Sequence, residues 1–335
     1  MNARIKSFSI GLTIAATLTA GGVASAGSPS APPDYGMNFV TIGHAGNRLP
    51  TSKEAPLGAN YGSVDYEYRI METPVTVGMW WEFVQAYALY TDDSSQAFTS
   101  GWILRDFEGN LYPPADVALQ YPADMSFRYA ARFVNWLHNG KGSDRASFEN
   151  GVYDTSTFTQ NPDGTFNDQS VRNSGSKYWI PTIDEWTKAN HYDPNRYGPG
   201  QEGYWLYPDG GNEPLIPGLP ENGGETDAGT VATQGPSYVG SYPWSESPLG
   251  LLDASGGLQE WTSSDSGGGR RFLPDSAQTS GLPEFLDRLD WLTTQWPSNG
   301  GQGFRIASAV PTPSTLPVLI AVVAYSRRRN RWITR

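Results

Sequence analysis

Three segments of the chain repeat apolar residues at the spacing of one helix face. Each follows a side chain that can accept a hydrogen bond from the first helical turn, so Thr76, Ser126 and Thr182 are predicted N-caps. Thr182 and Glu185 also have the spacing of a capping box. The pattern predicts three amphipathic helices, with these inward residues: Trp80, Phe83, Val84, Tyr87 and Ala88; Phe127, Ala130, Ala131, Val134 and Leu137; Ile183, Trp186 and Ala189.

Short β-like segments lie between these helices and on either side of them. The clearest are "MNFVTIG" near Met37, "YEYRIMETPV" near Tyr68, "KYWIP" near Tyr178 and "GFRIAS" near Phe304. The rest is rich in Gly, Pro, Asn and Asp, with 38 glycines and 26 prolines in the chain. Such loops need buried aromatic residues or bound ions to hold them. We therefore predict a loop-rich α+β domain with little regular secondary structure.

Both ends of the chain are predicted to be targeting segments. A basic start at Arg4 and Lys6, an apolar run over 10–23 and the small residues of 24–26 predict a signal peptide over 1–26 and export. At the other end, an apolar run over 316–325 is followed by four arginines. Ten residues span roughly 15 Å as a helix, about half a bilayer core. The predicted organisation is a domain over 36–309 and a tail over 310–335.

The tail resembles the PEP-CTERM sorting signal of bacterial exported proteins, with "VPTPSTLP" preceding the apolar run and the arginine cluster. Thr312 and Pro317 depart from that pattern. The resemblance implies a membrane sorting protease as partner and a bacterium that makes exopolysaccharide. It also implies an exported protein of the periplasm, cell envelope or extracellular space, transiently held at the membrane by the tail.

Charge and composition exclude several function classes. Seven of the 23 basic residues lie in the two terminal segments, so the part between them carries 16 basic and 34 acidic residues, a net charge of −18. Such a surface repels nucleic acid and tolerates divalent cations. The chain has no cysteine, which removes thiol nucleophiles, thiolate metal ligands and redox pairs.

Five blocks, in order, resemble the formylglycine-generating enzyme or sulfatase-modifying factor family over residues 38–308. The blocks are "YRIMETPVTVGMWWEFV", "SFRYAARFVNWL", "YWIPTIDEWTKANHYDP", "VGSYPWSESPLGLLDASGGLQEWTSS" and "GFRIAS". The resemblance implies the C-type-lectin-like α+β fold of that family.

One departure from the family bears directly on activity. Its oxidase members need a cysteine pair that binds copper, and this chain has none, so we expect neither copper nor that oxidase activity. We predict no catalytic residue. Other relatives hold iron through histidines, but His44, His138 and His191 lie far apart and none forms a ligand pair. They are interpreted as structural.

The stretch "GLLDASGGLQEW" carries the candidate metal site. From spacing alone it is either a hairpin with two solvated carboxylates or an oxygen cage for calcium. The family resemblance favours calcium, held by the side chains of Asp253 and Glu260 and the backbone oxygens of Gly256 and Leu258. A second family calcium site falls near 222–231, where Asn222, Glu225 and Asp227 are candidates.

Three functions stay open. The favoured one is a non-catalytic binding module for polysaccharide or an envelope protein, because many aromatic side chains offer stacking platforms. Trp205, Trp244, Trp291 and Trp296 are the predicted surface platforms, whereas Trp179, Trp186 and Trp261 are predicted core. The alternatives are an enzyme that uses carboxylates with Arg270 and Arg271, and a purely structural envelope protein.

Overall fold

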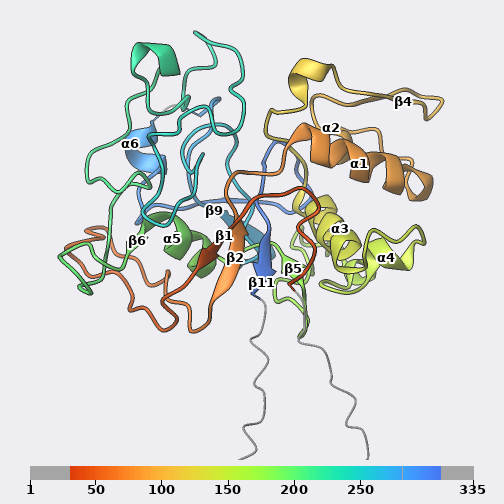
Figure 1. Ribbon diagram of the computed structural model, residues 1–335. Helices are drawn as coiled ribbons and strands as arrows, with labels where there is room; N and C mark the ends of the chain where they lie inside the picture. The colour runs from red at the N-terminus through yellow and green to blue at the C-terminus, as the bar shows by residue number, and fades with distance from the viewer. Residues whose placement is uncertain (1–30, 281, 311–335) are drawn as a thin grey trace, which may run out of the picture. The chain divides into compact units, whose positions relative to one another are not determined.

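The computed structural model describes residues 31–280 and 282–310, built around a small antiparallel sheet (Figure 1). Its strand order is β1-β2-β11-β5, and every neighbouring pair is antiparallel. Ile70 lies opposite Val40 on one side and Ala307 on the other, so the first and last strands of the domain share a neighbour. The bounds are Phe39–Ile42 for β1, Tyr68–Met71 for β2, Tyr178–Trp179 for β5 and Ala307–Ala309 for β11.

The three predicted helices are confirmed, and so are their caps. Helices α1 (Val77–Tyr87), α3 (Phe127–His138) and α5 (Ile183–His191) begin directly after Thr76, Ser126 and Thr182, whose side chains each accept a backbone N–H of the first turn. Thr182 and Glu185 form the complete capping box. Figure 1 shows α1 and α3 on one side of the central sheet and α5 on the other.

The remaining elements are short. The α-helices are α2 (Gln96–Thr99), α4 (Ala146–Glu149) and α6 (Pro283–Leu286), and the 3₁₀-helices are η1 (Ala88–Tyr90), η2 (Asp116–Ala118), η3 (Thr155–Thr157) and η4 (Pro220–Asn222). A three-stranded sheet of order β10-β9-β8 and two hairpins complete the fold. Their strands are β8 (Asp265–Gly267), β9 (Arg270–Leu273), β10 (Thr293–Gln295), β3 (Leu104–Arg105), β4 (Leu111–Tyr112), β6 (Tyr192–Asp193) and β7 (Gly203–Tyr204).

Aromatic side chains hold the core together, as the loop-rich sequence requires. Trp80 of α1 packs on Phe133 of α3 with ring centroids 5.4 Å apart, and both rings contact Phe304, just before β11. Trp179, Trp186 and Trp261 are buried, which confirms the prediction for all three. Because aromatic pairs add to the free energy of area burial, this cluster anchors long irregular segments without many strands.

The structure does not test the two predicted targeting segments at the ends of the chain. The signal peptide and, apart from Val310, the sorting tail lie outside the described residues. Within the part of the chain that the structure describes, no helix is both long and apolar enough to traverse a bilayer.

Candidate functional site

Between Asp253 and Glu260 the predicted metal loop lies outside the helices and strands and contains three residues with positive φ, Asp253, Gly256 and Gly257. Asp253 has φ = 57° and Gly256 has φ = 83°. Asp tolerates this region better than most residues do, which suits it to the first position. At Gly256 a Cβ atom would lie 2.3 Å from Oδ1 of Asp227, so any side chain there would collide with that carboxylate. The loop is therefore packed directly onto the Asp227 segment.

The side chain of Glu260 is committed to an internal ion pair. Its carboxylate accepts hydrogen bonds from Nε and Nη2 of Arg305, at 2.8 Å and 2.5 Å for the shortest, and from the indole N–H of Trp186 at 3.1 Å. Glu260 and Arg305 are both fully buried. A carboxylate offers about four lone-pair sites, and four contacts from these two donor residues occupy them.

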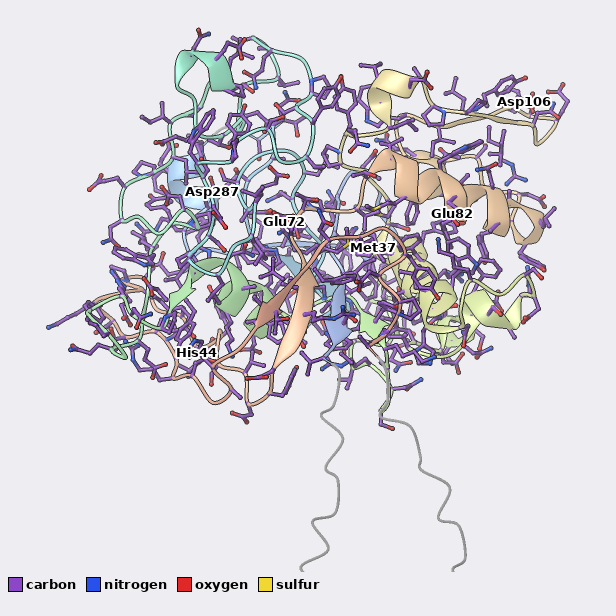
Figure 2. All side chains as sticks on the ribbon, viewed as in Figure 1. Met37, His44, Glu72, Glu82, Asp106 and Asp287 are labelled. Atoms are coloured by element: carbon purple, nitrogen blue, oxygen red, sulfur yellow. The ribbon has the colours of Figure 1, made fainter. Side chains whose placement is uncertain are left out.

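Arg305 also collects the carbonyl oxygens around the predicted calcium loop. Its Nη2 donates to the carbonyls of Leu252 and Asp253 at 3.1 Å and 3.2 Å, and its Nη1 donates to the carbonyl of Glu72 at 3.0 Å. Figure 2 labels Glu72, which directly follows β2. An internal guanidinium thus ties together four chain segments, the role for which sequence analysis invoked a bound ion.

The four predicted calcium ligands are only partly brought together. Asp253, Gly256 and Leu258 line one cavity of about 20 Å³, whereas Glu260 does not. The carboxylate of Asp253 accepts the N–H of Gly240 at 2.7 Å, and burial raises its pKa to about 7. A carboxylate and backbone carbonyls are the ligand types that a hard cation takes. Glu260 could join them only by giving up part of its contact with Arg305, and the calcium site stays a prediction.

Asp227 also lines this cavity, and it comes from the segment considered for a second calcium site. It is 2% exposed. Its Oδ1 accepts the N–H of Gly257 at 2.6 Å, and its Oδ2 is buried with no hydrogen-bond partner among the described residues. Burial raises its pKa, while the N–H of Gly257 and the nearby Ser237 oppose the change. Such a group costs free energy unless something pairs with it.

The other two candidates of that segment do not join Asp227. Asn222 is exposed, and Glu225 uses its carboxylate to accept the N–H of Ile216 at 2.8 Å. Among the residues that the structure describes, these candidates therefore form no second cluster of metal ligands.

Two further buried acids, Asp287 and Asp275, contact the same loop. Asp287 accepts the N–H of Ser276 at 2.7 Å and the hydroxyl of Ser255 at 2.6 Å, and burial raises its pKa to about 7. Asp275 accepts the N–H of Glu260 at 3.1 Å, and burial together with the charge of Glu260 raises its pKa well above the usual range. The region therefore gathers acids whose ionised forms are costly.

A larger cavity of about 100 Å³ adjoins the small one. Asp227, Ser237 and Leu258 line both. Its outer wall is aromatic, because Trp102 packs on Tyr121 with ring centroids 4.9 Å apart. Tyr121 in turn stacks on Tyr238 at 5.1 Å with an interplanar angle of 22°. Trp102 and Tyr238 are 38% and 46% exposed. We call these three rings and the two cavities the aromatic cleft.

The surface tryptophans proposed from sequence divide into two groups. Trp244 and Trp291 are exposed, at 54% and 43%. Trp205 and Trp296 are half-buried, and each carries an arginine over its ring: Arg196 at 4.6 Å and Arg270 at 4.1 Å. Sequence reasoning missed Trp102, because its segment shows no periodicity and matches none of the family blocks.

The arginines and histidines named from sequence do not form a site. Arg271 is fully buried over the ring of Phe127 at 4.5 Å and cannot hold an external anion. His138 accepts the N–H of Lys177, and His191 is buried against the carbonyl of Trp205. Within residues 31–280 and 282–310, no group of three or more His, Cys, Asp and Glu side chains is arranged to hold a metal ion.

Comparison with known proteins places this geometry in context. Residues 36–281 match the family described as sulfatase-modifying factor enzyme 1-like domain. Three solved structures are similar and cover 82% of this chain: CarF (19% identity, TM-score 0.47, 98% of that chain), Treponema denticola variable protein 1 (15%, 0.45, 95%) and PvdO from Pseudomonas aeruginosa (15%, 0.43, 92%). No curated protein matches. The family match covers the first four of the five blocks and confirms the family resemblance and, with it, the C-type-lectin-like α+β fold; the fifth block, "GFRIAS", lies beyond the matched residues.

Proposed function

We propose that this chain, which belongs to the sulfatase-modifying factor enzyme 1-like family, is a non-catalytic binding module of the cell envelope whose ligand is a polysaccharide. The chain has no cysteine, so it lacks the thiolate chemistry of the family's oxidase members. The signal peptide and sorting tail read from the sequence would deliver it to the cell surface. A sorting protease would act on the tail, and an envelope protein is the alternative ligand.

One observation carries the polysaccharide proposal: the continuous aromatic wall of Trp102, Tyr121 and Tyr238 beside two connected cavities. Rings with an open face and a polar neighbour bind the apolar faces of sugars by stacking and leave the hydroxyl groups to side chains. Trp244 and Trp291 are more exposed than Trp102, but neither lines these cavities. The aromatic cleft is therefore the better platform.

The test is to screen the protein on a glycan array and to titrate it with the exopolysaccharide of the bacterium that makes it. Truncation in W102A removes a stacking partner and should weaken binding about 5- to 10-fold, which corresponds to roughly 1–1.4 kcal/mol. W244A removes a more exposed tryptophan that does not line the cleft and should leave binding unchanged. Absence of glycan binding, or equal effects of the two variants, would contradict the proposal.

Calcium is a separate proposal for the small cavity. We propose that the side chain of Asp253 and the carbonyls of Gly256 and Leu258 hold the ion, with Glu260 sharing its carboxylate between calcium and Arg305. Its effect would be to fix the loop that forms the floor of the cleft. A ligand bound only by the native state, present at a hundredfold excess over its Kd, stabilises by about 2.7 kcal/mol.

Chelation provides the corresponding measurement. Adding EGTA should lower the Tm by about 5 °C, since roughly 2 °C per kcal/mol is expected at this size. D253N should lose most of that calcium response. A Tm that is the same with EGTA and with excess calcium would end the calcium proposal without touching the polysaccharide proposal.

A further inference from the structure

We infer that the aromatic cleft selects a glycan with free amino groups, so that a protonated sugar amine pairs with Asp227. The inference rests on the proposed polysaccharide function and narrows it from polysaccharides in general to amine-bearing ones. It starts from Asp227, whose buried Oδ2 accepts no well-aligned hydrogen bond from the described residues although Ser237 lies beside it.

Asp227 has a vacant acceptor at the junction of the two cavities. Its Oδ1 is bound by the N–H of Gly257, whereas its buried Oδ2 has no partner in the described chain. An isolated buried carboxylate is strongly unfavourable, and a hydrogen-bonded cation is the partner that offsets this cost best. The vacancy therefore matches a ligand group that donates N–H bonds and carries positive charge.

The charges that line the cleft all have one sign. Asp124 and Asp227 line the larger cavity, Asp227 and Asp253 line the smaller one, and no Lys, Arg or His lines either within the described residues. The oxygens of Asp124 are already engaged by the hydroxyl of Ser100, the N–H of Gly101 and the amide of Gln96. Asp253 is engaged by Gly240. Burial raises the pKa of Asp253 to about 7, so at pH 6 the negative potential that favours a cationic ligand and repels uronate or sulfated glycans rests on Asp124 and Asp227.

The sizes of the two cavities suit an amino sugar. The smaller holds about 20 Å³, which is room for one group the size of a water molecule. An ammonium has that size. The larger, about 100 Å³, opens beside Trp102 and Tyr121, where a sugar ring could stack. Tyr238 lines the smaller cavity, so an ammonium held there lies beside an aromatic ring and gains cation–π attraction.

The surroundings favour a glycan over a lysine-rich peptide. The lining segments 236–239, 256–258 and 278–279 all lie outside the named strands, so they offer no strand edge on which a peptide backbone could pair. A continuous wall of three rings provides more flat area than one aliphatic lysine stem can cover. A sugar with a charged substituent uses both the wall and the carboxylate.

The experiment compares three β-1,4-linked hexasaccharides that differ only at C2: cellohexaose with a hydroxyl, chitosan hexamer with an amine and chitin hexamer with an N-acetyl group. Binding is titrated at pH 6 by calorimetry and by tryptophan fluorescence, for the wild type, D227N, E108Q and W102A. E108Q is the control, because it removes the same charge from an exposed position in the turn between β3 and β4. All titrations contain EGTA and are repeated with calcium, which places positive charge near Asp227 and should weaken amine binding.

The chitosan hexamer should bind the wild type and E108Q at least about tenfold tighter than cellohexaose does. D227N should bring the two affinities together, and W102A should weaken both. Equal affinity for amine and hydroxyl sugars, or a chitosan preference that survives in D227N, would overturn the inference while W102A-dependent binding keeps the polysaccharide proposal.

Two other outcomes also decide the matter. If a hexalysine peptide binds in an Asp227-dependent manner and the hexasaccharides do not, the cleft is a peptide site and the inference is wrong. If no glycan of any class binds, the inference and the proposed function fail together. Thermal unfolding of each variant shows whether a loss of binding reflects a loss of fold.

Discussion

Two neighbouring regions of the molecule bury a carboxylate and treat it in opposite ways. Glu260 is fully buried and meets Arg305 and the indole of Trp186, so its charge is neutralised and its oxygens are saturated. Asp227, 2% exposed and in contact with the same loop, keeps one oxygen without a partner at the wall of a cavity. Burial alone therefore does not distinguish a structural acid from a ligand-binding one. The difference lies in whether the protein supplies the compensating charge.

The largest expected loss of stability comes from removing Arg305, the ion-pair partner of Glu260. R305M leaves the carboxylate of Glu260 buried and unpaired and also frees the carbonyls of Leu252, Asp253 and Glu72. Removing one partner of a buried ion pair costs about 3–5 kcal/mol. Chemical denaturation should show a loss of stability of at least that size.

The double variant R305M/E260Q tests whether charge is the cause. Removing both charges should recover part of the loss, because no unpaired charge then remains. If R305M is too unstable to purify, R305K retains the positive charge and should show a smaller loss. A double variant no more stable than R305M would show that Arg305 acts through its backbone contacts and not through Glu260.

The second expected effect is a pH dependence of the stability that arises from Asp287, which contacts the loop at Ser255. Burial raises the pKa of Asp287 to about 7, above the value of an unfolded chain. The native state then binds a proton that the unfolded state has lost, so the stabilising contribution is complete below about pH 4 and is lost as the pH rises towards 7. We expect stability to fall by on the order of 2 kcal/mol between pH 5 and pH 8.

D287N isolates this contribution. Asparagine can still accept the N–H of Ser276 and donate to Ser255, and it cannot ionise. Its stability relative to the wild type should therefore be higher at pH 8 than at pH 5. An identical pH profile for the two proteins would show that Asp287 does not ionise differently on folding.

The sequence was informative where local physics decides the structure. The helix caps could be predicted, because a hydroxyl directly before an amphipathic helix accepts a backbone N–H that the first turn leaves unpaired. This holds for Thr76, Ser126 and Thr182. The β-like segments at Tyr68 and Tyr178 became strands for a similar reason, since apolar β-formers bounded by turns have few alternatives. Trp261, which ends the predicted metal loop, is in the core as predicted.

The candidate site depends on contacts between distant segments, and these left no signal in the sequence. Glu260 and Arg305 are 45 residues apart, and nothing in "GFRIAS" shows that its arginine points at the predicted calcium loop. Trp102 and Tyr238 meet through Tyr121 from three irregular segments. The family blocks pointed to the Asp253 loop, but they could not show that a guanidinium already holds Glu260. Side-chain pairing across loops is set by the whole fold, and no local periodicity encodes it.

The smallest expected change in stability comes from replacing Asp227. Comparing D227N with E260Q tests most directly whether the two carboxylates differ. D227N keeps the acceptor for the N–H of Gly257 and removes an uncompensated charge. At pH 8, in EGTA and without glycan, it should match the wild type or exceed its stability by about 1 kcal/mol. E260Q under the same conditions should lose about 3 kcal/mol or more, because Arg305 is left without its counterion. Denaturation midpoints of the two variants measured side by side decide the point. If D227N is destabilised as much as E260Q, then Asp227 is a structural acid whose partner is internal, and the cleft has no vacancy for a ligand to fill.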